Sequence, residues 1–484
     1  MMSHHASIVF VPQTPLNITQ RGQELSTSPV SSALQAVTRR PTFALYTLGC
    51  KVNQYDSHQI SRSLVQRGFR RVEFRESADL YVIDTCTVTA EADKKSRKAA
   101  GRAHRNNAEA VVAITGCAAA YARDQFQRVV PDALVLDNTR KLELPELAIA
   151  ALQARPDWNN EYSKLRDEIG SEPLPSATRE RAVLKVQDGC NHKCSYCIIP
   201  TVRGASVTKT RETIMSEARA FVREGARELT VTGVSMSDWG AAQNRENHHS
   251  RNAALCDLLR SVAKIEGLER VRVSSLDPAD VDDEFLHTVA NTPKVCPHIH
   301  LALQAGSAAT LRRMRRRYTP EMFLRAAKRW REIRPDGGLT TDVIVGFPGE
   351  TAADFEQSLH IAREAKFSAV HVFPYSPRAG TVAAGLPDHV APAEQKRRVD
   401  ALLQLARELS AEYAAQFLGQ TLPVLVESTG HDAIEGMTPH YVKARVQLES
   451  STQQIAPGDI VWMCAAKWSD DTLHGTWQPR LGRE

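Results

Sequence analysis

The chain has 484 residues, 42% of them apolar and 24% charged, and its net charge is +5. This is the composition of an ordinary globular protein, long enough for about three domains of roughly 150 residues each. No apolar run reaches the roughly 18 residues that a membrane-spanning helix needs, so we expect no membrane segment. The slight excess of positive charge is, by itself, weak evidence for a nucleic-acid partner.

Residues 1–40 are rich in Ser, Thr, Gln and His and contain no apolar stretch of the kind found in signal peptides. We predict a disordered extension here. The chain has nine cysteines, and without a secretion signal they favour a reducing compartment, where thiolates bind metals or react rather than form disulfides. A cytoplasmic location is therefore expected.

Three short apolar runs within residues 41–150 each end in a cysteine, at Cys50, Cys86 and Cys117. Their β-branched and aromatic residues predict buried strands, and a helical pattern follows each strand. This repeat predicts an open parallel α/β sheet, whose strands all end along one edge. The three cysteines would meet there as one metal site; the alternative is that they are ordinary buried thiols. The expected helices are Asp56–Arg67, Ala90–Arg105 and Ala118–Val129.

A polar linker at 151–180 leads into residues 181–417, where strand and helix patterns alternate again. Six such units predict an open, partial (βα)6 barrel with its active site at the carboxyl ends of the strands. The expected strands are Ala182–Gln187, Glu228–Thr232, Arg270–Ser274, His298–Leu303, Thr340–Val345 and Ala369–Phe373. The expected helices include Thr213–Glu224, Ala253–Ile265, Pro320–Ile333, Thr351–Ala365 and a long one near Pro392–Gln416.

Three more cysteines, Cys190, Cys194 and Cys197, follow the first of these strands in one short loop. Three thiolates hold three irons of a cubane cluster and leave the fourth iron open to a reactant. Structural metal sites close their coordination shell, whereas catalytic sites keep a position open. The spacing therefore points to chemistry, and His192, between two of the ligands, is expected to face solvent. The remaining thiols, Cys256, Cys296 and Cys464, are expected to be core or surface residues.

Residues 418–484 contain short alternating strands with glycines and a proline in the turns, which predict a small β-barrel. Such barrels often bind single-stranded nucleic acid, and Lys443 and Arg445 are our candidates for RNA contacts. A purely structural β-cap is the alternative. A second basic group suits a polyanion equally well, although charge runs are usually solvated surface. Its members are Arg312, Arg313, Arg315, Arg316 and Arg317.

Several motifs, taken together, resemble the methylthiotransferase family of radical S-adenosylmethionine (radical SAM) enzymes, and the likeness extends from about Thr42 to Trp477. The motifs are Gly49–Ser57, Asp84–Val88, Thr115–Ala118, Cys194–Pro200 with Arg203-Gly204, and Val343–Glu350. The resemblance implies an N-terminal cluster domain, a radical SAM partial barrel and a C-terminal RNA-binding β-barrel called TRAM. The implied domain limits are 41–150, 181–417 and 418–484.

The resemblance also implies two 4Fe–4S clusters and S-adenosyl-L-methionine (SAM) as cofactors. Cys190, Cys194 and Cys197 would bind the cluster that cleaves SAM to a 5′-deoxyadenosyl radical, because an adenine C–H has no acidic proton for a base to remove. An auxiliary cluster held by the first three cysteines would carry the sulfur. Supporting SAM contacts are expected from Tyr196, Gly233, Ser235, Ser274, Ser275, Gln304 and Asp342.

Within the family, Lys51–Gln54 and Val372–Thr381 resemble the branch that modifies N6-threonylcarbamoyladenosine beside the anticodon of tRNA. This implies a tRNA substrate, an electron donor such as flavodoxin or ferredoxin, and a sulfur source. Other enzyme readings are methylthiotransfer to N6-isopentenyladenosine or to a ribosomal protein, and a radical SAM enzyme with vestigial N-terminal cysteines. A non-catalytic iron–sulfur RNA-binding protein is the alternative from another class.

Overall fold

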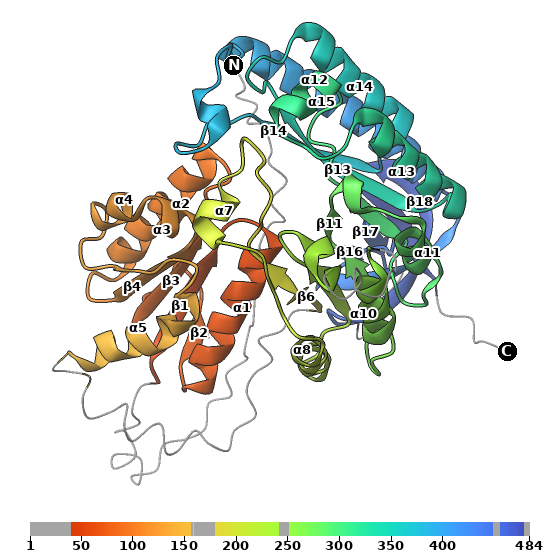
Figure 1. The fold of residues 1–484 in the computed structure, drawn as a ribbon. Helices are drawn as coiled ribbons and strands as arrows, with labels where there is room; N and C mark the ends of the chain where they lie inside the picture. Colours follow the sequence, from red (N-terminus) through yellow and green to blue (C-terminus); the bar gives the residue numbers. More distant parts are fainter. Residues whose placement is uncertain (1–39, 156–157, 159–179, 242–250, 449–454, 479–484) are drawn as a thin grey trace. The chain divides into compact units, whose positions relative to one another are not determined.

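The computed structural model describes residues 40–155, 158, 180–241, 251–448 and 455–478 (Figure 1). The chain divides into two units, Met1–Ala177 and Thr178–Glu484. The predicted extension and most of the predicted linker lie outside the described residues. Among those that are described, no helix is long and apolar enough to cross a membrane.

Unit 1 is a five-stranded, fully parallel sheet in the order β2-β1-β3-β4-β5. Helices cover both faces, with α1 and α5 packed on one side and α2, α3 and α4 on the other. The predicted open parallel α/β domain is confirmed. Its strands are β1 Thr42–Thr47, β2 Arg70–Val72, β3 Leu80–Thr85, β4 Val111–Gly116 and β5 Leu134–Val135. Its helices are α1 Lys51–Gln66, α2 Ala90–Asn106, α3 Cys117–Tyr121, α4 Arg123–Gln127 and α5 Leu144–Gln153.

One helix prediction in unit 1 is wrong. The expected helix Ala118–Val129 is two short helices, α3 and α4, which meet at Ala122. Ala122 has φ −140° and ψ 48°, outside the helical region, so the backbone changes direction there. The break lets Phe126 of α4 turn into the core beside β4. The edge strands β2 and β5 and the helix α5 have no counterpart among the expected elements.

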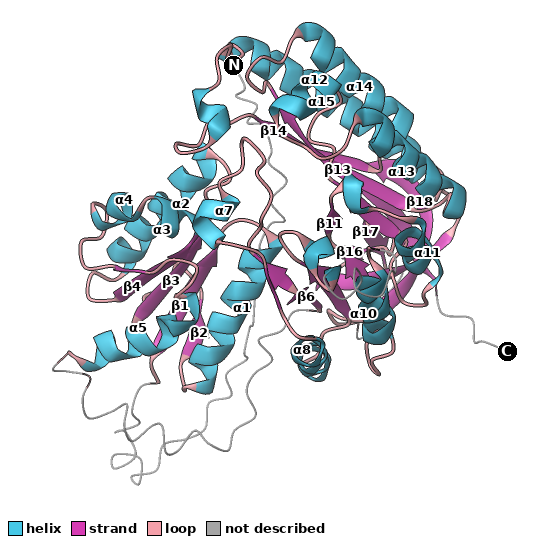
Figure 2. Ribbon diagram, in the orientation of Figure 1, coloured by secondary structure: helices cyan, strands magenta, loops and turns pink. Residues whose placement is uncertain are grey.

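Unit 2 begins with a curved parallel sheet (Figures 1 and 2). Its strands run in the order β6, β9, β10, then β11, β12, β13 and β14. The chain passes from β10 to β11 at Ser274, whose N–H donates to the carbonyl of Val231. Before this residue the chain pairs with β9, and after it the chain pairs with β12. All pairs in this curved sheet are parallel, which confirms the six-stranded partial barrel.

The expected barrel strands agree with the structure to within two residues at each end. The strands are β6 Arg181–Lys185, β9 Glu228–Thr232, β10 Arg270–Val273, β11 Ser275–Leu276, β12 His298–Leu301, β13 Gly338–Val345 and β14 Ala369–Pro374, with a short hairpin of β7 Gln187–Asp188 and β8 Val207–Thr208. The helices are α7 Ile199–Arg203, α8 Arg211–Arg223, α10 Ala253–Ala263, α11 Asp283–Asn291, α12 Ala308–Arg313, α13 Pro320–Ile333, α14 Ala352–Ala365 and α15 Pro392–Ala415.

Helix α13 shows how local sequence sets an element. Thr319 caps it by accepting the N–H of the residue three positions on, and Pro320 at the first turn needs no N–H partner. Phe323, Ala327 and Trp330 follow at helical spacing, and all three are buried. The same pattern repeats in the other barrel helices, so one apolar stripe on each helix covers the outside of the sheet.

The C-terminal segment is a closed five-stranded barrel in the order β15-β16-β17-β19-β18. The β17–β19 pair is parallel and the others are antiparallel. The predicted small β-barrel is confirmed, with one strand more than expected, because β16 was not foreseen. The strands are β15 Thr421–Thr429, β16 Ala433–Met437, β17 Lys443–Gln447, β18 Ile460–Ser469 and β19 Thr472–Gln478.

The small barrel is fixed to the partial barrel by buried arginines on β10. Arg270 donates to the carbonyl of Met437 at 2.7 Å, and Arg272 donates to the carbonyl of Pro439 at 3.0 Å. Arg272 also pairs with Glu228 of β9 at 2.8 Å, and both side chains are almost fully buried. These contacts join two β structures into one body at the amino ends of the parallel strands, opposite the edge that carries the cysteines.

Candidate metal centres

The three N-terminal cysteines lie at the carboxyl ends of β1, β3 and β4, which are neighbours in the sheet. Cys50 caps the start of α1, Cys86 follows β3, and Cys117 begins α3. Cys86 and Cys117 are buried and Cys50 is exposed. Burial raises the pKa of the Cys86 thiol well above its usual range, and the neighbouring Cys117 and Cys50 thiols add to this rise. The sheet thus places three thiols from distant parts of the sequence at the ends of neighbouring strands.

Glycines precede two of these cysteines, and the packing explains why. Gly116 has φ +96°, and a Cβ on it would lie 2.4 Å from a carboxylate oxygen of Asp84 and 2.4 Å from the carbonyl oxygen of Thr85. Gly49 has φ +106°, and a Cβ there would lie 2.9 Å from the Cβ of Cys86. Both positions combine a left-handed backbone with a close approach to the next strand, which only glycine accommodates without strain.

A buried ion pair lies within the same domain, beside the strand that leads to Cys86. The Nζ of Lys141 is 2.7 Å from the carboxylate of Asp56 and 3.9 Å from that of Asp84, and all three side chains are at most 4% exposed. Asn53 donates to the carbonyls of Leu48 and Thr85 at 2.8 and 2.9 Å. Helix α1 is thereby tied to the ends of β1 and β3, which carry two of the thiols.

The second set of cysteines belongs to the loop that follows β7. The N–H of Cys190 donates to the carbonyl of Gly204 at 3.1 Å, and the N–H of Cys197 donates to that of Cys194 at 3.1 Å. Arg203, buried at the end of α7, pairs with Asp188 at 2.9 Å, just before the loop. These contacts tie the two ends of the loop together. The backbone that carries the three thiols is therefore fixed by contacts within the loop itself.

The loop thiols are partly buried, and burial controls their ionisation. It raises the pKa of Cys197 to about 12, and the pKa of Cys190 is also raised, chiefly by burial. Bare thiolates are therefore unfavourable here, whereas a cluster of iron cations would supply the missing positive charge. Three soft sulfur donors fit a 4Fe–4S cluster with one open iron, and the same holds for the three thiols of unit 1.

Arg316 is the unexpected member of this site. Its guanidinium donates to the Sγ of Cys194 at 3.0 Å and pairs with Asp277 at 2.8 Å. Its place in a run of arginines predicts an RNA contact, because the sequence does not show which way each side chain points. Of its neighbours, Arg317 pairs with Asp280 and Arg313 lies 3.4 Å from Asp354. Arg312 and Arg315 are exposed.

The expectation that His192 faces solvent is wrong. Its side chain is partly buried, and its Nε2 lies 3.2 Å from the Oγ of Ser235, after β9. Together with Cys194, Asp277 and the run from Arg315, it lines a cavity of about 210 Å³. The loop is therefore in contact with the end of the second barrel strand, where a SAM contact was expected.

The other expected SAM contacts lie along the same rim of the partial barrel. Gly233 and Ser235 follow β9, and the N–H of Ser235 donates to the side chain of Gln187 at 2.7 Å. Ser274 and Ser275 lie where β10 passes into β11. Gln304 and Asp342 are joined through their backbones, N–H to carbonyl, at 2.8 Å. The ring of Tyr196 packs edge-on against that of Phe347, with the two ring centroids 6.4 Å apart. The set comes together at one edge, while its role toward SAM stays a prediction.

The expected RNA contacts of the C-terminal barrel lie on its outer surface. Residues alternate between buried and exposed along β17, and Lys443 and Arg445 are both on the exposed side. Arg445 lies 3.3 Å from Glu435 on the neighbouring strand β16. The remaining cysteines are spread over unit 2: Cys256 and Cys296 are buried, and Cys464 lies on β18.

Comparison with known proteins agrees with this arrangement. The model of the radical SAM superfamily matches residues 184–362, which cover the three-cysteine loop and most of the partial barrel. A second model, described as the uncharacterized protein family UPF0004, matches residues 42–137, the sheet with the dispersed cysteines. The fold and the loop site therefore define a radical SAM protein, a class whose members use a 4Fe–4S cluster and SAM.

Curated relatives narrow the class. The threonylcarbamoyladenosine tRNA methylthiotransferase MtaB of Bacillus subtilis is 34% identical over 83% of this chain and 89% of its own length. The tRNA-2-methylthio-N(6)-dimethylallyladenosine synthase of Syntrophotalea carbinolica is 35% identical over 80% of this chain and 89% of its own. The chain belongs to the tRNA methylthiotransferase family of radical SAM enzymes.

Among solved structures, the radical SAM methyltransferase TsrM of Kitasatospora setae, with cobalamin and a 4Fe–4S cluster bound, is 15% identical to this chain. Its match covers 70% of this chain and 77% of that one, with a TM-score of 0.48.

Proposed function

We propose that this protein transfers a methylthio group to the adenine ring of N6-threonylcarbamoyladenosine beside the anticodon of tRNA, giving the 2-methylthio derivative. The observation that carries the proposal is the pair of three-thiol sites, one in each unit and each at the carboxyl edge of a parallel sheet. A single radical SAM cluster suffices to break a C–H bond, whereas adding sulfur also requires a sulfur carrier. A second site with an open iron position supplies a place for it.

In this proposal the two sites have different tasks. Cys190, Cys194 and Cys197 hold the 4Fe–4S cluster that, when bound with SAM, provides one-electron cleavage and a carbon radical. Cys50, Cys86 and Cys117 hold an auxiliary 4Fe–4S cluster for the sulfur. A second SAM molecule is the methyl donor. The contribution of the chain is to hold the thiols at the ends of the strands, to orient SAM along the rim and to exclude water.

The remaining partners follow from this chemistry. Lys443 and Arg445 on β17, with the exposed Arg312 and Arg315, offer cations to the phosphates of tRNA. Flavodoxin or ferredoxin is the proposed reductant, and a separate sulfur source replaces the sulfur consumed in each cycle. We place the protein in the cytoplasm, with its substrate.

The relatives leave one competing substrate. Those named dimethylallyladenosine synthases are as similar to this chain as those named MtaB, at 35% and 34% identity. Two further relatives named MtaB, from Thermotoga maritima and Chlamydia pneumoniae, are 32% and 34% identical. Identity alone does not separate the substrates, and our choice rests on the runs Lys51–Gln54 and Val372–Thr381.

Mass spectrometry of nucleosides from tRNA tests the proposal. In cells that lack the gene, we expect the 2-methylthio derivative of N6-threonylcarbamoyladenosine to disappear and the unthiolated nucleoside to accumulate. Complementation with the wild-type chain restores it, and complementation with Cys197→Ala does not. Disappearance of the isopentenyl derivative instead would assign the competing substrate. No change in either nucleoside would remove tRNA as the substrate.

A further inference from the structure

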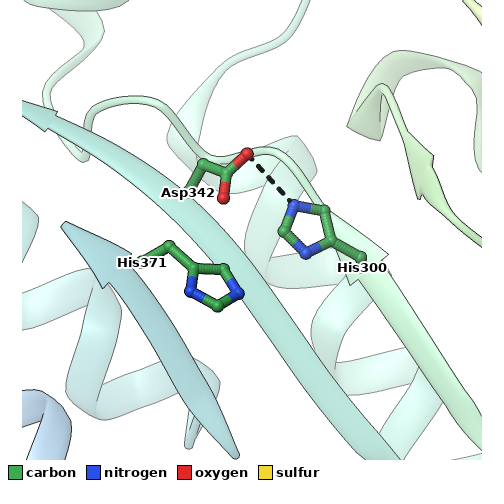
Figure 3. A group of neighbouring side chains, drawn as sticks. All are labelled: His300, Asp342 and His371. Atoms are coloured by element: carbon green, nitrogen blue, oxygen red, sulfur yellow. Dashed lines mark ion pairs between the residues drawn. The ribbon is translucent and has the colours of Figure 1, made fainter. Parts of the chain in front are cut away.

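Three polar side chains from neighbouring barrel strands converge: His300 on β12, Asp342 on β13 and His371 on β14 (Figure 3). One nitrogen or oxygen atom of each lies within 4.8 Å of the others. The Nε2 of His300 is 3.4 Å from the carboxylate of Asp342, and the two imidazole rings are stacked with centroids 6.1 Å apart. The three residues are distant in sequence, and only the parallel sheet brings them together.

The group lies on the face of the sheet that the outer helices leave uncovered. Leu339, Thr341 and Val343 on β13 are at most 1% exposed, because they point toward the helices. Asp342 points the other way, and its side chain is 33% exposed; that of His300 is 12% exposed. Asp342 is the register partner of His371, so the two share one face of the sheet. The group therefore faces the inside of the partial barrel.

The surroundings of the group form layers along the strands. Nearer the cysteine edge, Ile344 and Phe373 are register partners on the same face, and Ile344 packs against the cluster of residues around Phe347. On the opposite side, the Oγ of Thr340 lies 2.9 Å from the Nδ1 of His300 and 2.9 Å from the Nε2 of His298. The polar group thus sits about 7 Å deeper than an apolar layer, two residues along the strand.

A metal ion fits this geometry poorly. A metal bound by histidine lies in the plane of the imidazole ring, along the nitrogen lone pair. The rings of His300 and His371 are stacked, and their planes are inclined by only 21°. A single ion between the rings would therefore lie outside both ring planes. Asp342 is moreover already engaged by the Nε2 of His300. Hydrogen bonding to an organic group suits these rings better.

The substituent on N6 of the proposed substrate has the matching chemistry. A threonylcarbamoyl group carries ureido N–H donors close to the adenine and a carboxylate at its far end. An isopentenyl group is wholly apolar. If the adenine ring occupies the layer of Ile344 and Phe373, its N6 substituent extends toward the polar group two residues further along the strands.

We propose that Asp342 and His371 recognise the threonylcarbamoyl substituent, Asp342 by accepting a ureido N–H and His371 by donating to the carboxylate. His300, held by Thr340, is a positioning residue that fixes the carboxylate of Asp342. This assignment rests on the proposed function, and it moves Asp342 from the expected SAM contacts to the substrate contacts.

The arrangement would reject the apolar analogue as well as bind the polar substrate. An isopentenyl group would cover Asp342 and two imidazoles without offering them a hydrogen-bond partner. Sites built to hydrogen-bond a substrate discriminate strongly against an analogue that lacks the polar group, because buried partners are then left unpaired. The three residues would thus decide which of the two modified adenosines is accepted.

The test uses the full-length enzyme with both clusters reconstituted, and anticodon stem-loop RNAs carrying N6-threonylcarbamoyladenosine, N6-isopentenyladenosine or adenosine. We expect Asp342→Asn and His371→Phe each to lower kcat/KM for the first RNA by about tenfold or more, mainly through KM. His371→Gln keeps an N–H donor and should retain most of the selectivity. Formation of 5′-deoxyadenosine from SAM without RNA, and the cluster absorbance, should stay unchanged in both His371 variants.

Matched controls are His360→Phe, on the exposed surface of α14, and Asp257→Asn, on the exposed surface of α10, which should leave the selectivity unaltered. If the wild-type enzyme modifies only the isopentenyl RNA, the proposed function fails. If it modifies the threonylcarbamoyl RNA and the Asp342 and His371 variants keep the full preference, the proposed function stands and this inference is overturned. A stoichiometric metal other than iron that is lost in His371→Phe would also overturn it.

Discussion

The two cysteine sites use the same number of thiols but are built in opposite ways. Cys190, Cys194 and Cys197 come from one loop, which its own backbone hydrogen bonds and the Arg203–Asp188 pair hold in shape. Cys50, Cys86 and Cys117 come from three different strands and meet only when the whole parallel sheet of unit 1 has formed. The loop site is local, whereas the strand-end site depends on the fold of its domain.

This difference has a thermodynamic meaning. A ligand set that exists only in the folded state couples metal binding to folding, because the binding free energy then stabilises the domain as a whole. A ligand set within one loop is close in the unfolded chain as well, so its coupling to folding is weaker. Unit 1 should gain more stability from its cluster than the partial barrel gains from the loop cluster.

The largest expected effect comes from removing one thiol from each site. Cys194→Ala and Cys86→Ala should each leave about four irons per chain instead of about eight. Both should abolish methylthio product, but only Cys194→Ala should also abolish 5′-deoxyadenosine formation. Iron analysis and chromatography of the reaction check this. Product formation by Cys86→Ala would show that the strand-end site is dispensable and would break the comparison.

The next effect targets the fold beneath the strand-end site. Lys141→Met leaves the carboxylates of Asp56 and Asp84 buried without their cation, which should cost about 3–5 kcal/mol in the free energy of unfolding of unit 1. The variant should lose the strand-end cluster and keep the loop cluster. Denaturant titration with iron analysis measures both. Arg140→Met is the control, since its pair with Glu143 is exposed and screened by solvent and should contribute little to stability.

A third effect weakens unit 2 without touching its cysteines. Burial alone would raise the pKa of Glu228, but Arg272 and Arg181 outweigh it and hold that pKa at about 2, against an ordinary 4.5. The ionised carboxylate therefore stabilises the fold above about pH 4.5, and this contribution is lost as the pH falls toward 2. Glu228→Gln should cost about 3 kcal/mol at pH 7.

The difference between wild type and Glu228→Gln should shrink as denaturation is repeated from about pH 5 down to about pH 3. Because Glu228 lies at the amino end of β9, the loop cluster should survive at pH 7. A gap that stays constant over this range would mean that folding does not lower the pKa of Glu228. Loss of the loop cluster at neutral pH would mean that this site also depends on the fold of the whole partial barrel.

The smallest effect concerns the environment of the loop cluster. Arg316→Gln removes a cation that donates to the Sγ of Cys194, and this cation favours the more negative, reduced state of a bound cluster. The midpoint potential should fall by on the order of 50 mV. A redox titration followed by electron paramagnetic resonance, in the Cys86→Ala background, isolates this cluster. The control is Arg315→Gln, which changes an exposed neighbouring residue and should leave the midpoint potential unchanged.

Much of the fold was predictable because β1, β3 and β4 of unit 1 are largely apolar runs and because helical patterns separate the strands in both units. The strand Glu228–Thr232 and the helix Pro320–Ile333 have the predicted bounds. The break at Ala122 was not predictable, since its neighbours form an unbroken helical pattern and the local backbone is set by packing of Phe126. The strand Ala433–Met437 was missed because it is short and contains a glycine.

The site was predictable only in part. Cysteine spacing and strand-end positions predicted both groups of thiols, and their roles as cluster ligands stay predictions. The contact of Arg316 with Cys194 could not be predicted, because the sequence shows the charge of a side chain and not its orientation. His300 and His371 gave no signal as single histidines on strands, and only the register of β12, β13 and β14 brings them beside Asp342.

The glycines before Cys50 and Cys117 have a consequence for protein design. A designer who moved only the three strand-end cysteines into another parallel sheet would create two side-chain clashes there. The residues before two of the cysteines would then carry a Cβ where this chain has glycine. The left-handed backbone at Gly49 and Gly116 turns the chain sharply into the following helix, and the missing side chains leave room for the neighbouring strand. The smallest transferable unit of this site is therefore five residues, three cysteines and two glycines.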